Sequence, residues 1–165
     1  MPLVLVRIDD RLVHGQVVEG WIPALRAEHV LVVSDAAADD ETQVALMRLA
    51  LPEAEGLEVL GVAAAARHPA LGGSFVKRTL VLAPGPGEVA GLLEGGARFP
   101  EVNVGGLHYT AGRVQLGKAI FLSDQDKEAL RAIAGRGVRL TGKALPSDAA
   151  IDILEMIGAS GEAGP

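Results

Sequence analysis

The chain has 165 residues, of which 49% are hydrophobic and 22% are charged, and this suits one globular domain over residues 1–165 with a substantial buried core. A net charge of −6 and an aromatic content of 3% argue against nucleic acid as a partner, because no basic face with interleaved aromatic residues is present. The chain has no cysteine, which excludes disulfides and thiolate chemistry and favours a reducing cytoplasm.

Short apolar runs rich in β-branched residues alternate with amphipathic stretches along the chain. Nearly all-apolar runs such as Val30–Val33 indicate strands buried on both faces. We therefore predict an α/β fold: a single open, mostly parallel, twisted sheet of about seven strands, with helices on both faces. The predicted strands are 3–8, 29–33, 57–62, 79–83, 101–104, 118–122 and 138–143. The predicted helices are 15–25, 39–51, 63–67, 87–94, 124–134 and 147–157, followed by a frayed tail over 158–165.

The first predicted strand ends in a charged loop, Arg7–His14, followed by Gly15. In open α/β sheets, ligands bind at the carboxyl ends of strands and over helix N-termini, where free N–H groups stabilise anions. Arg11 supplies a planar guanidinium group that suits phosphate oxygens. These features predict that the neutral imidazole of His14 attacks a phosphoryl group and forms a phosphoramidate, stabilised by Arg11, the Gly15 N–H and the helix dipole. Neither a metal nor an organic cofactor is required for this step.

Two acids in the same loop, Asp9 and Asp10, have roles that the residues alone leave open. Either one could hold Arg11 or could fix the tautomer of the His14 imidazole. The alternative interpretation of the loop is a solvated salt-bridge cluster in which His14 only caps the turn. Short motifs of this kind do not by themselves decide between the two interpretations.

The segment RIDDRLVHGQV closely resembles the signature of the IIB component of the mannose/sorbose-type bacterial sugar phosphotransferase system. The resemblance continues through Trp21, the segment VVSDAAADDE, Pro52 and Asn103–Gly106, and it covers nearly the whole chain, without an appended IIA domain.

The resemblance implies a phosphotransferase in which His14 is the phosphorylated residue. It implies that a phosphohistidine on a IIA partner donates the phosphoryl group, which then passes to a sugar hydroxyl at the membrane IIC and IID components. It further implies that Arg11 steadies the transferred group and that Asp10 orders the loop. The protein would then lie in the cytoplasm, peripheral to the inner face of the cell membrane through its transporter partners.

Four further residues are candidates for the same anion site. Gly105 and Gly106 follow a strand and could supply N–H groups, although a tight turn that only glycine fits is the alternative. Ser34 and Asp35 end the second strand, which we expect beside the first. They could hydrogen-bond to the phosphohistidine loop, but capping of the following segment is the favoured role.

The remaining conspicuous side chains have less specific interpretations. Trp21, the only tryptophan, is expected in the core rather than as an anchor for a partner. His29, His68 and His108 lack the spacing of a metal site, so no metal is predicted, and His108 is expected on the surface.

Two other functions on this scaffold remain open. One is a regulatory or binding module in which His14 is phosphorylated but no sugar receives the group. The other is a phosphate-binding protein without a covalent step. In any of these roles, one helix face could pair with a copy of itself to form a homo-oligomer.

Overall fold

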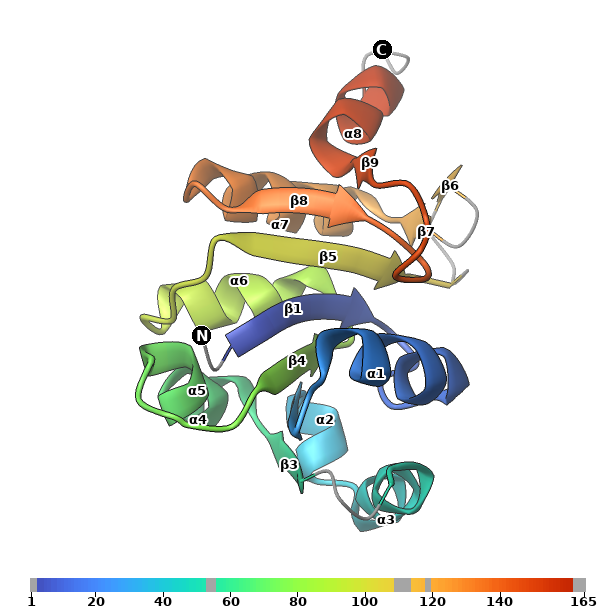
Figure 1. Cartoon of the computed structure of the whole chain (residues 1–165). Helices are drawn as coiled ribbons and strands as arrows, with labels where there is room; N and C mark the ends of the chain where they lie inside the picture. The colour runs from blue at the N-terminus through green and yellow to red at the C-terminus, as the bar shows by residue number, and fades with distance from the viewer. Residues whose placement is uncertain (1–2, 53–55, 109–113, 118–119, 162–165) are drawn as a thin grey trace.

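The computed structural model contains a seven-stranded, mostly parallel sheet (Figure 1). It describes residues 3–52, 56–108, 114–117 and 120–161. The strand order is β3-β2-β4-β1-β5-β8-β9, and every neighbouring pair is parallel except β8 and β9. The strands are β1 (Leu3–Asp9), β2 (His29–Val33), β3 (Gly56–Leu60), β4 (Thr79–Ala83), β5 (Glu101–Gly106), β8 (Arg139–Gly142) and β9 (Ile151–Asp152).

Helices cover both faces of this sheet. They are a π-helix η1 (Val17–Trp21) that continues into α1 (Ile22–Leu25), then α2 (Asp35–Ala38), α3 (Glu41–Ala50), α4 (Val62–Ala66), α5 (Pro69–Gly72), α6 (Pro86–Glu94), α7 (Asp124–Gly135) and α8 (Ile153–Gly161). Among the described residues, no helix is long and apolar enough to cross a bilayer.

Two buried apolar clusters lie on opposite faces of the sheet. Along β2, Leu31 and Val33 belong to the cluster beneath α4, α6 and α7, whereas Val30 and Val32 belong to the cluster beneath η1, α1 and α3. Successive strand residues point to opposite faces, and here both faces are apolar. The α/β fold predicted from the all-apolar strands is therefore confirmed, and Trp21 lies in the second cluster as expected.

The position of β2 corrects one expectation. The second strand in the sequence does not lie beside the first, because β4 pairs with both β1 and β2 and separates them. Chain order does not determine strand order in a sheet with crossover connections, and this error bears on the assignment of Ser34 and Asp35.

The C-terminal part also differs from the prediction. The described portion of the predicted strand 118–122 is β7 (Ile120–Leu122), which pairs antiparallel with β6 (Val114–Gly117) in a separate small sheet, and residues 118–119 lie outside the described residues. The seventh strand of the main sheet is instead the short β9.

The last helix begins later and ends later than predicted. Ser147-Asp148 does not start it, because Asp148 closes a local turn in which its carboxylate accepts the Leu145 N–H and its own N–H donates to the Leu145 carbonyl. The helix α8 begins only at Ile153, after β9, and continues to Gly161, beyond the predicted start of a frayed tail at 158. Residues 162–165 lie outside the described residues.

Candidate active site

A tight turn after β1 places His14 at the carboxyl edge of the sheet. The Leu12 N–H donates to the Asp9 carbonyl at 3.0 Å, and Leu12 has a φ of 57°, in the left-handed region that non-glycine residues rarely adopt. This conformation costs about 1 kcal/mol, which burial of the Leu12 side chain offsets. The His14 carbonyl accepts the Val18 N–H at 2.9 Å, so His14 lies directly before the first helical turn.

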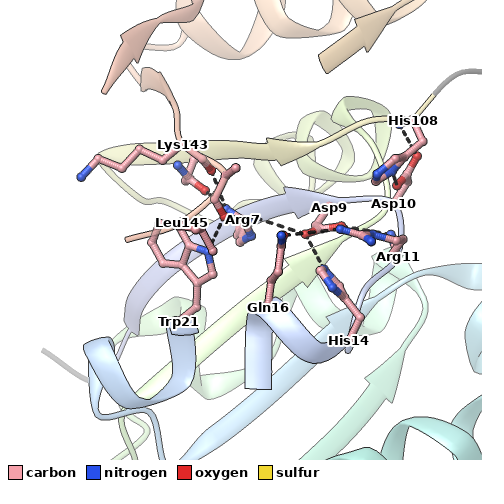
Figure 2. A network of polar contacts seen from close by, with 12 residues as sticks. Arg7, Asp9, Asp10, Arg11, His14, Gln16, Trp21, His108, Lys143 and Leu145 are labelled. Carbon is pink, nitrogen blue, oxygen red and sulfur yellow. Dashed lines mark hydrogen bonds and ion pairs between the residues drawn. The ribbon is translucent and has the colours of Figure 1, made fainter. Parts of the chain in front are cut away.

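Asp9 orients the imidazole of His14. The Nε2 atom of His14 lies 2.8 Å from Oδ2 of Asp9, whose side chain is 1% exposed, while that of His14 is 15% exposed (Figure 2). The other oxygen, Oδ1, accepts the Arg11 N–H at 3.1 Å. Because an ionised carboxylate only accepts hydrogen bonds, Nε2 of a neutral His14 carries the proton and Nδ1 carries the free lone pair.

The Asp9 carboxylate is held in its ionised form. Burial alone would raise its pKa, but the hydrogen bond from His14 and the positive charges of Arg7 and of a protonated His14 ring outweigh this effect. The pKa therefore lies below its usual value of 3.8. Asp9 is consequently a fixed negative charge next to the imidazole at neutral pH.

A buried arginine supports this carboxylate from inside the protein. Arg7 is 1% exposed, and its Nη2 lies 3.2 Å from Oδ2 of Asp9. The same guanidinium donates to the Asn103 side-chain oxygen, to the Lys143 carbonyl at 2.9 Å and to the Ala144 carbonyl at 3.1 Å. These partners compensate the desolvation of a buried charge. Arg7, Asp9 and His14 thus form a continuous chain from the core to the surface.

Trp21 and Gly105 shape the space around the guanidinium. The Trp21 ring centroid lies 4.6 Å from Cζ of Arg7, a cation–π contact, and its indole N–H donates to the Ala144 carbonyl at 3.0 Å. A Cβ atom at Gly105 would overlap Cζ of Arg7. Glycine at this position in β5 therefore makes room for the buried charge.

We expect Gly105→Ala to destabilise the protein by about 3 kcal/mol, because the new methyl group displaces Arg7 and leaves Asp9 without its buried partner. Urea unfolding measures this change. Gly135→Ala on α7 is the matched control, since nothing lies within 4 Å of its added Cβ, and it should change stability by no more than about 1 kcal/mol. Equal stabilities of the two variants would contradict this role of Gly105.

Arg11 and Gly15 lie on the solvent side of His14. Both residues are exposed, and the Arg11 guanidinium contacts the Gln16 side-chain oxygen at 3.4 Å. No carboxylate among the described residues forms an ion pair with Arg11. Gly15 lies at the start of the helical segment, where the first N–H groups have no intrahelical acceptor. The loop around His14 therefore carries an exposed positive charge and free backbone donors close to the histidine in sequence.

Asp10 ties the loop to the end of β5. Its carboxylate accepts the His108 N–H at 2.7 Å and lies 2.6 Å from Nδ1 of the same residue, and its own N–H donates to the Gly106 carbonyl at 2.9 Å. The His108 side chain is 42% exposed, and Figure 2 shows it next to Asp10. Of the two acids that the sequence left undecided, Asp9 contacts the imidazole and Asp10 anchors the loop.

Gly106 pairs with Asp9 across the β1–β5 ladder, and a Cβ atom there would lie 3.3 Å from Oδ1 of Asp9. The strand β5 continues through both glycines, rather than ending in a turn before them. The structure therefore places Gly105 and Gly106 against Arg7 and Asp9, which support His14 from behind.

Ser34 and Asp35 are not brought to His14. The Ser34 hydroxyl accepts the Ala37 N–H at 3.1 Å and caps α2, while Oδ1 of Asp35 accepts the Val62 N–H at 2.8 Å at the start of α4. With β4 between β2 and β1, these contacts belong to the neighbouring connections of the fold. In the structure, Ser34 therefore caps a helix, which was the role favoured from the sequence.

Sequence reasoning did not identify Arg7 as part of the site. Two signals were available: a basic residue within an otherwise apolar strand, and a pair of glycines in the strand that proves to lie beside it. The Lys143 and Ala144 carbonyls that accept from Arg7 could not be found from residue types, because backbone oxygens carry no sequence signal.

The fold and the site together define an α/β protein that presents a histidine, hydrogen-bonded through Nε2 to a buried aspartate, at the carboxyl edge of a mostly parallel sheet. A family model described as the PTS system sorbose subfamily IIB component matches residues 3–163. The chain belongs to this family and is a phosphoryl-transfer component of a sugar phosphotransferase system.

Individual relatives agree with this assignment. The chain is 34% identical over 160 residues to the fructose-specific EIIB component of Bacillus subtilis, with 95% of this chain and 96% of the relative covered. It is 32% identical to the mannose-specific EIIAB component of Escherichia coli K12, of which it spans 49%. The crystal structure of the IIBSor domain of the Klebsiella pneumoniae sorbose permease superposes with a TM-score of 0.87 at 30% identity, covering 97% of this chain and 98% of that one.

Proposed function

We propose that His14 accepts a phosphoryl group from a phosphorylated IIA component and passes it to a sugar at the membrane IIC and IID components. The observation that carries this proposal is the hydrogen bond of 2.8 Å between Nε2 of His14 and Asp9, which leaves Nδ1 as the nucleophile. The His14 side chain is 15% exposed, so a donor protein can contact the imidazole from solvent.

In the first step, the Nδ1 lone pair attacks phosphorus, and the nitrogen–phosphorus bond of the donor phosphohistidine breaks. The His14 ring then carries a phosphoryl group on Nδ1 and a proton on Nε2, so it becomes cationic. Asp9, ionised and fixed by Arg7, stabilises this positive ring without taking its proton. In the second step, the sugar hydroxyl oxygen attacks phosphorus and releases its proton to the surroundings, while the bond from Nδ1 to phosphorus breaks. His14 then returns to the neutral ring with its proton on Nε2.

Arg11 and the start of the helical segment stabilise the phosphoryl oxygens in this proposal. Arg11 is exposed, and Asp9 accepts its backbone N–H, so its side chain is free to turn toward an anion on His14. The first N–H groups of the helical segment, from Gly15 onward, add hydrogen-bond donors and the positive end of the helix.

Arg11→Ala should slow phosphoryl transfer from the IIA donor roughly 100-fold, because one charged donor to the transferred group is lost. The rate of label transfer in a single-turnover experiment measures this effect. Arg131→Ala, which removes an exposed arginine on α7, should leave the rate unchanged. A rate for Arg11→Ala equal to that of the Arg131→Ala control would exclude this role.

A labelling experiment tests the proposed function as a whole. The chain is mixed with a IIA component carrying a radiolabelled phosphoryl group, and then with vesicles containing the IIC and IID components and sugar. We expect an acid-labile, base-stable label on the chain that moves to sugar only when the vesicles are present. A label that forms on the chain but never reaches any sugar would favour the regulatory function instead.

The location and the partners of the chain follow from this function. The chain acts at the inner face of the cell membrane through contact with the membrane components, and it meets the IIA component with the same exposed edge that carries His14. The sugar is then bound by the membrane components.

A further inference from the structure

Three side chains with metal-ligating atoms meet at the other side of the fold from His14. His29 is the first residue of β2, Glu58 lies in β3, and His68 precedes α5. Among the described residues, this is the only group of three or more such ligands whose donor atoms all lie within 4.8 Å of one another. Because the strands are parallel, the start of β2 lies at the edge opposite to Asp9, the last residue of β1.

His29 presents a buried nitrogen that has no hydrogen-bond partner. The residue is 5% exposed, and its Nε2 atom has no hydrogen bond within the described part of the chain. Buried polar atoms are nearly always paired, so an orphaned imidazole nitrogen calls for an explanation. The ring fits here because a Cβ atom at Gly56 would lie 2.7 Å from its Nδ1.

The neighbouring groups are suited to a cation. The Nε2 atom of His29 lies 3.9 Å from Oε2 of Glu58, and Nε2 of His68 lies 2.6 Å from the same oxygen. A neutral imidazole nitrogen with a free lone pair is the form that binds metals. The Phe75 ring lies 5.1 Å from each imidazole and holds both in place.

We propose that His29 Nε2, His68 Nε2 and the Glu58 carboxylate form a binding site for a divalent transition metal of the zinc type. Two imidazoles and one carboxylate are the ligands that Zn²⁺ accepts. Ligands at about 2.1 Å around a tetrahedral metal are about 3.4 Å apart, and the separations of 2.6 and 3.9 Å from Glu58 lie on either side of this value. The two imidazole nitrogens lie within 4.8 Å of each other, so at most a slight movement brings them close enough to bind one ion. Glu58 is 42% exposed, so the metal enters from solvent and keeps a water as its fourth ligand.

Metal binding has a local consequence at α5. In the metal-free form, Nδ1 of His68 accepts the Ala70 N–H at 3.1 Å, so the ring proton is on Nε2 and points to Glu58. Coordination by Nε2 moves this proton to Nδ1, and the Ala70 N–H then loses its acceptor. The amide of Ala70 therefore reports metal binding independently of any activity.

The experiment uses the untagged full chain after treatment with a chelator. Titration with ZnCl₂ by calorimetry should give one equivalent bound and a raised unfolding temperature, together with a shift of the Ala70 amide resonance. His29→Leu and His68→Asn should abolish stoichiometric binding, and Glu58→Gln should weaken it at least tenfold. His68→Asn is the more informative variant, because asparagine can still cap α5 while it removes the ligand.

His108→Gln is the matched control, since it removes a histidine that contacts a carboxylate outside this cluster, and it should leave Zn²⁺ affinity unchanged. Absence of stoichiometric binding would overturn the proposal and leave the cluster as a hydrogen-bonded pair beside an unpaired ring. Binding that survives in both His29→Leu and His68→Asn, or that is lost in His108→Gln, would overturn it as well.

Discussion

His14→Asn should abolish phosphoryl transfer to below detection, while the protein remains folded. The asparagine side chain can still donate a hydrogen bond toward Asp9, but it has no nucleophilic nitrogen to form the phosphoramidate. His14 is part of a surface loop, so we expect the free energy of unfolding to change by about 1 kcal/mol at most. Labelling by a phosphorylated IIA component measures transfer, and urea unfolding verifies the fold.

The control for this variant is a second imidazole that plays no part in the proposed transfer. His68→Asn removes a histidine near the opposite edge of the sheet and should be labelled at the wild-type rate and to the wild-type extent. An acid-labile label that persists on His14→Asn would mean that a different residue carries the phosphoryl group.

Asp9→Asn should reduce the transfer rate by roughly 10³–10⁴-fold and destabilise the protein by about 3 kcal/mol. Both Asp9 oxygens accept hydrogen bonds: Oδ1 from the Arg11 backbone, and Oδ2 from Arg7 and His14. The amide of this variant must turn its NH₂ group toward one of these donors. If the NH₂ group faces the Arg11 N–H, two donors face each other and the loop is destabilised. If it faces His14, the proton of His14 must move to Nδ1. In the second case, the nucleophilic lone pair is lost.

The same variant has a defined pH dependence. The pKa of Asp9 is lowered by folding, so its contribution to stability is present above the unfolded value of 3.8 and is lost as the pH falls through the folded value. The stability difference between wild type and Asp9→Asn should therefore be largest near neutral pH and shrink in acid well below 3.8. A difference that stays constant across this range would show that the carboxylate charge does not stabilise the site.

The sequence predicts the strands well where burial alone determines them. The apolar runs at 29–33 and 79–83 match β2 and β4, because a strand covered on both faces must be apolar throughout. Short elements such as α2, α5 and β9 were not predicted, since four residues or fewer carry no hydrophobic period. The capping bonds of Ser34 and His68 define the two helices instead.

For the candidate site as well, the sequence predicted some of the residues, and others could be assigned only from the structure. The sequence motif predicted His14 and Arg11 as site residues. Which of Asp9 and Asp10 contacts the imidazole could be decided only from the geometry of the strand. Residues two apart in a strand share a face, so Arg7 and Asp9 point together into the protein, while Asp10 lies in the turn. Sequence spacing could not show that His29 and His68 lie close together, because these residues are distant in sequence and are brought together by β2, β3 and the α4–α5 connection.

The most direct test of the central claim is an NMR experiment on the phosphorylated chain that correlates phosphorus with the imidazole nitrogens. We expect the phosphoryl group on Nδ1 of His14, with the proton of Nε2 retained and hydrogen-bonded to Asp9. Phosphorus bonded to Nε2, or to any other residue, would contradict the orientation of the imidazole by Asp9 on which the proposed function rests.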